Sequence, residues 1–236
     1  LEPRITTARK EAEANSTPVG AAQRPYWPMQ PQAWGDHSRR LLLLAMLIAA
    51  PVDAAIHVVD DTGVSVQVAA PATRIVTLAP HAAELVYAAG AGARIVGVIK
   101  GTDYPPAARK LPVVGDVTAL DLERIVMLAP NLIVTWPWTT PAQVAWLRAR
   151  GVAVFEANAR HVDDIATDIE RIGVLTGTGA TAHDAANAFR ERVAQLVREG
   201  KDGPRLRVFY QVSDVPLFTL GGQHLVSQAI AQCGGR

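Results

Sequence analysis

The feature that most constrains the fold is the run 119–136, which predicts a helix, a stop and a buried strand in immediate succession. Asp121 is a good N-cap, and the apolar residues after it recur at helical spacing. Pro130 lacks an amide proton and ends the helix. The run 132–135 is typical of a strand covered on both faces. We therefore expect Trp136 at the carboxyl end of a parallel strand, where open sheets bind ligands.

The same alternation of short strands and helices extends over much of the chain. A β-hairpin is predicted before these elements, at residues 57–68, with Gly63 in its turn. Strands are expected at 74–78, 95–99, 132–135 and 152–155, and further helices at 81–89, 141–150 and 161–175. Strands separated by helices form βα units and hence a parallel sheet. The predicted fold class is α/β, with a Rossmann-like parallel-sheet lobe.

The pattern changes after residue 180. A long helix is expected at 181–199, followed by a strand at 205–210, a loop and a helix from 223 to 232. One βα unit cannot bury both faces of its strand, so we expect the start of an incomplete second α/β lobe. The predicted domains are an N-terminal lobe with its hairpin at 55–180, a connecting helix at 181–200 and a partial C-terminal lobe at 201–236.

The N-terminal region predicts export. Residues 1–37 are interpreted as a disordered or untranslated leader, with Met29 as a sensible true start. Residues 38–54 are interpreted as a signal peptide, because two arginines precede the apolar run 41–50 and cleavage is expected after Ala54. That run is shorter than the roughly 20 apolar residues that span a bilayer. The predicted location is the periplasm.

Several function classes find no support in the sequence. The net charge of +1 gives no reason to expect a nucleic-acid partner, and a single cysteine excludes a disulfide framework. The histidines lack metal-ligand spacing, so no metal site is predicted, and Asp163, Asp164 and Asp168 are expected to form a solvated helix face. Nucleotide-loop and hydrolase motifs are absent, so no catalytic residue is assigned and the chain is expected not to be an enzyme.

Aromatic and apolar residues gather instead at the expected rims of the lobes. They are Pro80, Tyr104, Trp136, Trp138 and Phe218. Such rings favour a cleft that holds a large, flat, partly apolar ligand without covalent chemistry. Alternatively, Tyr104 and Trp138 only cover the core. His81 opens a helix at a strand end, so it either touches the ligand or is an exposed first-turn histidine.

Five segments carry a resemblance to a known family. The chain resembles the periplasmic binding proteins of ABC importers for cobalamin, haem and ferric siderophores, and most of all the cobalamin-binding branch. The segments are Arg74-Ile-Val-Thr-Leu-Ala-Pro80, Asp103-Tyr-Pro-Pro106, Leu122-Glu-Arg-Ile125, Ala129-Pro-Asn-Leu-Ile-Val134 and Cys233-Gly-Gly235. The resemblance covers roughly residues 57–236 and implies two lobes joined by one long helix, with the ligand between them.

The resemblance also implies roles for single residues. Pro80, Trp136 and Phe218 match cleft positions of the cobalamin binders, with Trp138 beside them, while Gly101 and Val117 replace aromatic residues. A cobalamin-like corrinoid is therefore the expected ligand, and haem or a ferric siderophore stays an alternative; no cofactor is implied.

Glu123 matches the acidic residue that docks this lobe onto arginines of the membrane permease. Alternatively, Glu123 serves only the helix dipole. The implied partners are the ABC importer permease of the inner membrane and a small metal-chelate ligand, and the chain is expected to be a monomer. Two alternatives from other classes are an exported α/β enzyme and a non-functional fragment.

Overall fold

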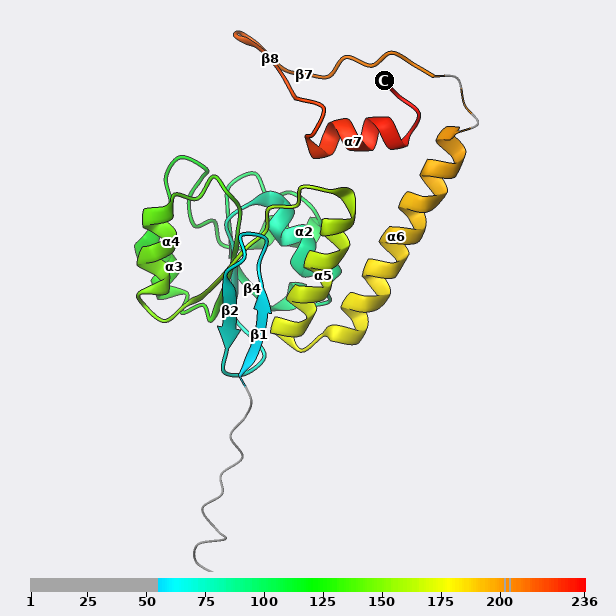
Figure 1. Ribbon diagram of the computed structural model, residues 1–236. Coiled ribbons are helices and arrows are strands. Elements are labelled where there is room, and N and C mark those ends of the chain that lie inside the picture. Colours follow the sequence, from blue (N-terminus) through cyan, green and yellow to red (C-terminus); the bar gives the residue numbers. More distant parts are fainter. Residues whose placement is uncertain (1–54, 202, 204) are drawn as a thin grey trace, which may run out of the picture. The chain divides into compact units, whose positions relative to one another are not determined.

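The computed structural model of the chain describes residues 55–201, 203 and 205–236 (Figure 1). The predicted leader at 1–37 and the predicted signal peptide at 38–54 lie outside the described residues. None of the described helices is both long enough and apolar enough to cross a bilayer.

A four-stranded parallel sheet forms the centre of the lobe, which confirms the predicted α/β class. Its strands are β3 (Ile75–Thr77), β4 (Ile95–Val98), β5 (Leu132–Thr135) and β6 (Ala153–Glu156). Their order in the sheet is β4-β3-β5-β6. From β3 the chain proceeds to the neighbour on one side, β4, and from β5 to the neighbour on the other, β6. The strand order therefore reverses between β3 and β5, and ligands of such sheets bind at that point.

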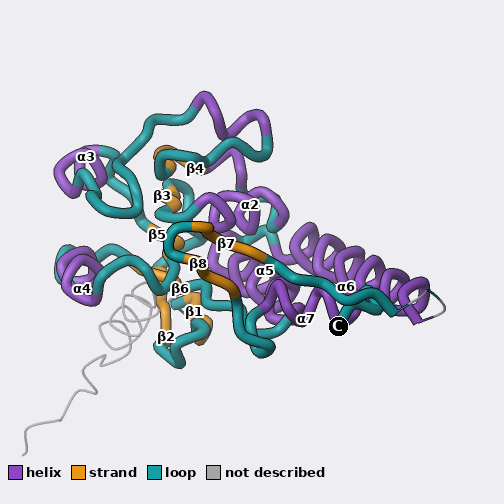
Figure 2. The backbone as a smooth tube through the Cα atoms, turned by 90° about the horizontal axis from the view of Figure 1, so that it is seen from above, coloured by secondary structure: helices purple, strands orange, loops and turns teal. Residues whose placement is uncertain are grey.

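Helices cover both faces of this sheet (Figures 1 and 2). One face carries α2 (Pro80–Ala88) and α5 (Val162–Thr176), and the other carries α3 (Leu122–Met127) and α4 (Pro141–Arg148). Side chains of β5 alternate between the two layers: Leu132 and Val134 pack with α2 and α5, whereas Ile133 packs with α3 and α4. Because both faces are covered, the strand consists of buried residues throughout, as its sequence predicts.

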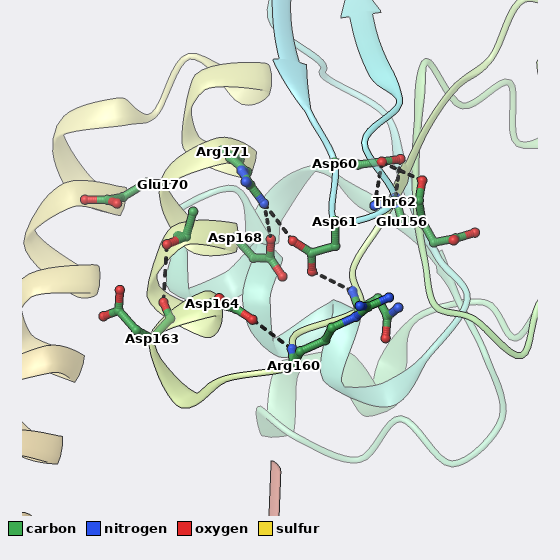
Figure 3. Close-up of polar contacts among 12 residues, drawn as sticks. Asp60, Asp61, Thr62, Glu156, Arg160, Asp163, Asp164, Asp168, Glu170 and Arg171 are labelled. Atoms are coloured by element: carbon green, nitrogen blue, oxygen red, sulfur yellow. Dashed lines mark hydrogen bonds and ion pairs between the residues drawn. The ribbon is translucent and has the colours of Figure 1, made fainter. Parts of the chain in front are cut away.

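The predicted hairpin is present and packs on the α2/α5 side of the lobe. Strands β1 (Ile56–Val59) and β2 (Ser65–Val68) pair antiparallel, and Val66 and Val68 are buried in the core of that side. The buried Asp60 carboxylate accepts hydrogen bonds from the backbone amides of Thr62 and Val64. These bonds close the turn and leave the next residue, Asp61, facing α5 (Figure 3).

The long helix α6 (Gly179–Lys201) begins two residues before the predicted start and packs tightly on α5. A Cβ atom on Gly173 of α5 would lie 2.2 Å from the Cβ of Ala182 of α6. The absence of a side chain at Gly173 therefore permits the close approach of the two helices.

We expect Gly173→Ala to destabilise the lobe by about 1–3 kcal/mol, because the added methyl forces α5 and α6 apart. Alanine normally stabilises a helix interior relative to glycine, so the packing effect reverses the usual sign. Urea denaturation measures the change. Gly179→Ala is the matched control, since a Cβ there meets nothing within 4 Å. Equal effects of the two substitutions would contradict the close packing.

The C-terminal segment differs from the prediction. The strand expected at 205–210 is wrong: the strands are β7 (Gln211–Asp214) and β8 (Leu217–Thr219), which pair antiparallel, followed by α7 (Leu225–Gln232). Residues 211–214 obtain a partner because the chain folds back within a few residues. The backbone of residues 206–208 instead exchanges hydrogen bonds with the last residue, Arg236. The apolar side chains of β7 and β8 are largely exposed.

Candidate functional site

A cavity of about 620 Å³ lies beside the carboxyl ends of β3 and β5, where the strand order reverses. Most of its wall is apolar or aromatic, and it draws on the strand-end loops together with α2, α5, α6 and α7. The lining residues used below are His81, Glu84, Tyr104, Trp136, Trp138, Asn158, Asp168 and His224. Small-molecule sites are commonly apolar cavities with a few polar groups, at the point of a sheet where the strand order reverses.

The end of β3 places His81 in this wall. Ala79 is extended and Pro80 opens α2, because a proline is favoured where the first helical amide has no partner. Pro80 itself is not among the lining residues. His81 follows in the first turn of α2, and its ring stands edge-on to Trp136 with centroids 5.4 Å apart.

The end of β5 supplies two indole rings. The backbone amide of Thr139 donates to the carbonyl of Trp136 at 3.0 Å, and the Thr135 hydroxyl donates to the Thr139 hydroxyl at 2.5 Å. This tight turn brings Trp138 back beside Trp136, with ring centroids 6.0 Å apart and planes inclined by 35°. Trp138 is 74% exposed, so it offers an open face at the mouth of the cavity.

The other residues predicted for the site are not all brought together. Tyr104 lines the cavity from the loop after β4 and is 63% exposed. Phe218 lies in β8, is 56% exposed and is not among the lining residues. Glu123 is exposed in the first turn of α3, on the other face of the sheet from α2. The structure thus groups His81, Tyr104, Trp136 and Trp138 and leaves Pro80 and Phe218 outside the cavity. Glu123, which is predicted for permease docking and not for the cavity, lies on α3.

Asp61, Asp168 and Arg171 form a charge network (Figure 3), and Asp168 also lines the cavity. The Asp61 carboxylate accepts hydrogen bonds from the backbone amide of Asn158 and from the Arg171 guanidinium, both at 2.7 Å. Arg171 also donates to Asp168 at 3.3 Å, and the second oxygen of Asp168, Oδ2, has no donor among the described residues. The network joins the hairpin, α5 and the cavity-lining residue Asn158.

Asp168 corrects an interpretation made from the sequence. The predicted solvated helix face comprises Asp163, Asp164 and Asp168, but Asp168 is fully buried. Burial, and then the neighbouring Asp61 carboxylate, raise the pKa of Asp168 to about 8 despite the opposing charge of Arg171. Asp168 therefore carries a proton at neutral pH, and this proton is available to bridge the two carboxyl groups.

The charges of the cavity wall restrict its ligands. Among the lining residues, acidic side chains are present at Glu84 and at Asp168, which is protonated at neutral pH, and neither lysine nor arginine occurs. No cluster of three or more metal-ligating side chains is found in the described part of the chain. The site is therefore suited to a ligand with large apolar faces and neutral polar groups, and the described residues do not form a cage for a bare metal ion.

The chain is similar in sequence to known binding proteins. Residues 75–236 match the family model described as periplasmic binding protein. A vitamin B12-binding protein of Vibrio cholerae serotype O1 is 37% identical over 166 residues, which cover 70% of this chain and 60% of the relative. That of Yersinia pestis is also 37% identical and covers 70% of this chain and 59% of the relative. These relatives are named binding proteins rather than enzymes.

Solved structures give the same assignment. The periplasmic vitamin B12 binding protein BtuF of Vibrio cholerae has a TM-score of 0.65 and 36% identity, over 70% of this chain and 66% of that chain. The periplasmic heme-binding protein RhuT from Roseiflexus sp. RS-1 has a TM-score of 0.60 and 26% identity, over 69% of this chain and 64% of that chain. This chain spans about 60% of the length of the curated relatives it matches. It belongs to the periplasmic binding protein family.

Proposed function

We propose that this chain is the ligand-binding component of an ABC importer, and that it holds a cobalamin-like corrinoid in the aromatic cavity. The observation that carries the proposal is the pair of adjacent indole rings, Trp136 and Trp138, at the switch point of the sheet. The flat apolar face of a macrocycle matches such a wall, since ring stacking needs an open aromatic surface. The similarity to vitamin B12-binding proteins supports the same ligand class.

Haem is the second candidate, because one similar structure is a heme-binding protein. The charges of the cavity favour the corrinoid. Haem carries two propionate groups, which bind most strongly to cationic side chains. The lining residues include the acidic Glu84 and no lysine or arginine, and Asp168 is protonated at neutral pH and offers no positive charge either. The amide side chains of a corrinoid are neutral and meet no such repulsion. A ferric siderophore with net negative charge is disfavoured for the same reason.

Equilibrium dialysis of the purified chain against cyanocobalamin, haemin and a ferric siderophore tests the ligand class directly. We expect saturable binding of cyanocobalamin at one site, with quenching of tryptophan fluorescence. Preference for haemin would overturn the corrinoid assignment and retain the family. If none of the three ligands binds, the proposal fails for this chain.

Delivery to the permease is proposed to use Glu123. The carboxylate is exposed in the first turn of α3, where it is free to accept a bidentate arginine from a partner. We expect Glu123→Gln to lower cobalamin uptake by about tenfold, the cost of one charge-assisted pair of about 1.4 kcal/mol or more, with ligand affinity unchanged. Uptake is measured as cobalamin-dependent growth of a bacterium that lacks its own binding protein.

Glu191→Gln is the control for this experiment, because Glu191 is likewise exposed but lies on α6. Its uptake should equal that of the unaltered chain. Normal uptake by the Glu123→Gln variant would show that the carboxylate serves only its own helix.

A further inference from the structure

We propose that the imidazole of His81 coordinates the metal of the bound macrocycle as an axial ligand. This inference depends on the proposed function and adds a direct bond between the chain and its cargo. It starts from the position of His81 in the cavity wall, in the first turn of α2 after the buried end of β3 and edge-on to Trp136.

His81 differs from His224, the other histidine that lines the cavity, in having no polar partner among the described residues. His57 also has no polar partner among them, but it is exposed in β1 and does not line the cavity. His161 and His183 each lie within ion-pair distance of a carboxylate, Asp164 and Glu170 respectively. His224, which also lines the cavity, accepts a hydrogen bond from the backbone amide of Val226. For His81 no hydrogen-bond partner is found among the described residues, and burial alone perturbs its pKa. Its ring nitrogens are therefore available to a ligand.

The protonation state of His81 suits metal binding. Burial at the cavity wall lowers the pKa of His81 below its ordinary value. A protonated imidazole is further disfavoured at the N-terminus of α2, where the helix dipole is positive and no acidic residue occupies the first turn. The ring is therefore neutral at pH 7, and a neutral imidazole is a common ligand for transition metals.

A chelated metal needs only one such ligand from the protein. A corrin ring supplies four nitrogen ligands in a plane and leaves two axial positions on the cobalt. In aquocobalamin one axial position holds an exchangeable water. Exchange breaks the cobalt–oxygen bond, releases that water and forms a cobalt–nitrogen bond with a lone pair of His81. No electron is transferred, the cobalt stays Co(III), and the proton on the other ring nitrogen stays in place.

The experiment compares aquocobalamin with cyanocobalamin, whose cyanide does not exchange readily. We expect the visible absorption bands of aquocobalamin to shift on binding to the unaltered chain, and those of cyanocobalamin to stay unchanged. With His81→Ala, the shift should disappear and the affinity for aquocobalamin should fall at least tenfold. The affinity of this variant for cyanocobalamin should change by no more than about threefold. Added free imidazole should restore the shift in the His81→Ala complex.

His57→Ala is the matched control, since His57 is exposed in β1 and does not line the cavity, so this variant should retain the shift. A shift that persists in His81→Ala, or binding of aquocobalamin to the unaltered chain without a shift, overturns the assignment of His81 and leaves the proposed function intact. Failure of the unaltered chain to bind either corrinoid overturns the proposed function, and the His81 assignment with it.

Discussion

Substitution of Trp136 by alanine is expected to weaken cyanocobalamin binding by roughly 100-fold, a loss of about 2–3 kcal/mol. The indole touches both His81 and Trp138 at the wall of the cavity, so its removal takes away the centre of the aromatic surface. Burial of a whole aromatic side chain, roughly 150–250 Å² at about 25 cal/mol per Å², sets an upper bound of roughly 4–6 kcal/mol. Equilibrium dialysis measures the affinity, and circular dichroism checks that the variant is folded.

Phe218→Ala is the informative comparison for Trp136→Ala. The family resemblance assigns Phe218 to the ligand cleft, whereas the structure places it in β8, outside the lining residues. We expect the affinity of the Phe218→Ala variant to stay within about twofold of the unaltered chain, because an exposed side chain away from the ligand contributes little. Equal losses for the two variants would contradict the geometry of the cavity.

The second large effect concerns stability and its dependence on pH. The pKa of Asp168 is raised in the folded state to about 8, from an ordinary value of 3.8 in the unfolded chain. Between these two values the folded state holds a proton that the unfolded state has lost, so stability decreases as the pH rises. An amide in place of the carboxyl group removes this proton linkage. We therefore expect Asp168→Asn to stabilise the lobe by about 2–3 kcal/mol more at about pH 8.5 than at about pH 5.5.

Urea denaturation at the two pH values gives the difference in the free energy of unfolding. Asp184→Asn is the control, since Asp184 is exposed on α6 and should show the same stability as the unaltered chain at both pH values. The buried carboxyl pair would be disproved if Asp168→Asn gained nothing between about pH 5.5 and about pH 8.5.

Strand ends were the most informative part of the sequence. Short apolar runs followed by proline or aromatic residues predicted β3 and β5, and parallel strands present their carboxyl ends at one edge of a sheet. For that reason His81, Trp136 and Trp138 could be placed near one another without coordinates. That they bind the ligand stays a prediction.

The burial of Asp168 is not predicted from the sequence, although the spacing of Asp168 in its helix indicates it. Asp168 lies three residues after Ile165 and four before Ile172, on the inward face of α5. Its polar character suggested solvent, because carboxylates are seldom buried without partners. The partner Asp61 is more than a hundred residues away in the chain, and no local pattern reveals such a pair.

The C-terminal strand was misplaced for a related reason. The apolar composition of residues 205–210 is typical of a strand, but strand formation depends on a neighbour with which to pair. The nearest neighbour is β8, and it pairs with residues 211–214 instead. Similarly, the position of Phe218 depends on how β7 and β8 fold, which the spacing of residues does not determine.

The reversal of strand order between β3 and β5 makes ligand choice separable from folding. His81 and residues 137–138 follow the buried parts of their strands and line the cavity, so they can vary while the packed layers beneath them stay the same. Substitution of a few residues in these two short segments would therefore be enough to change which ligand the fold binds. The core residues on the two faces of the sheet are constrained separately, by the stability of the fold.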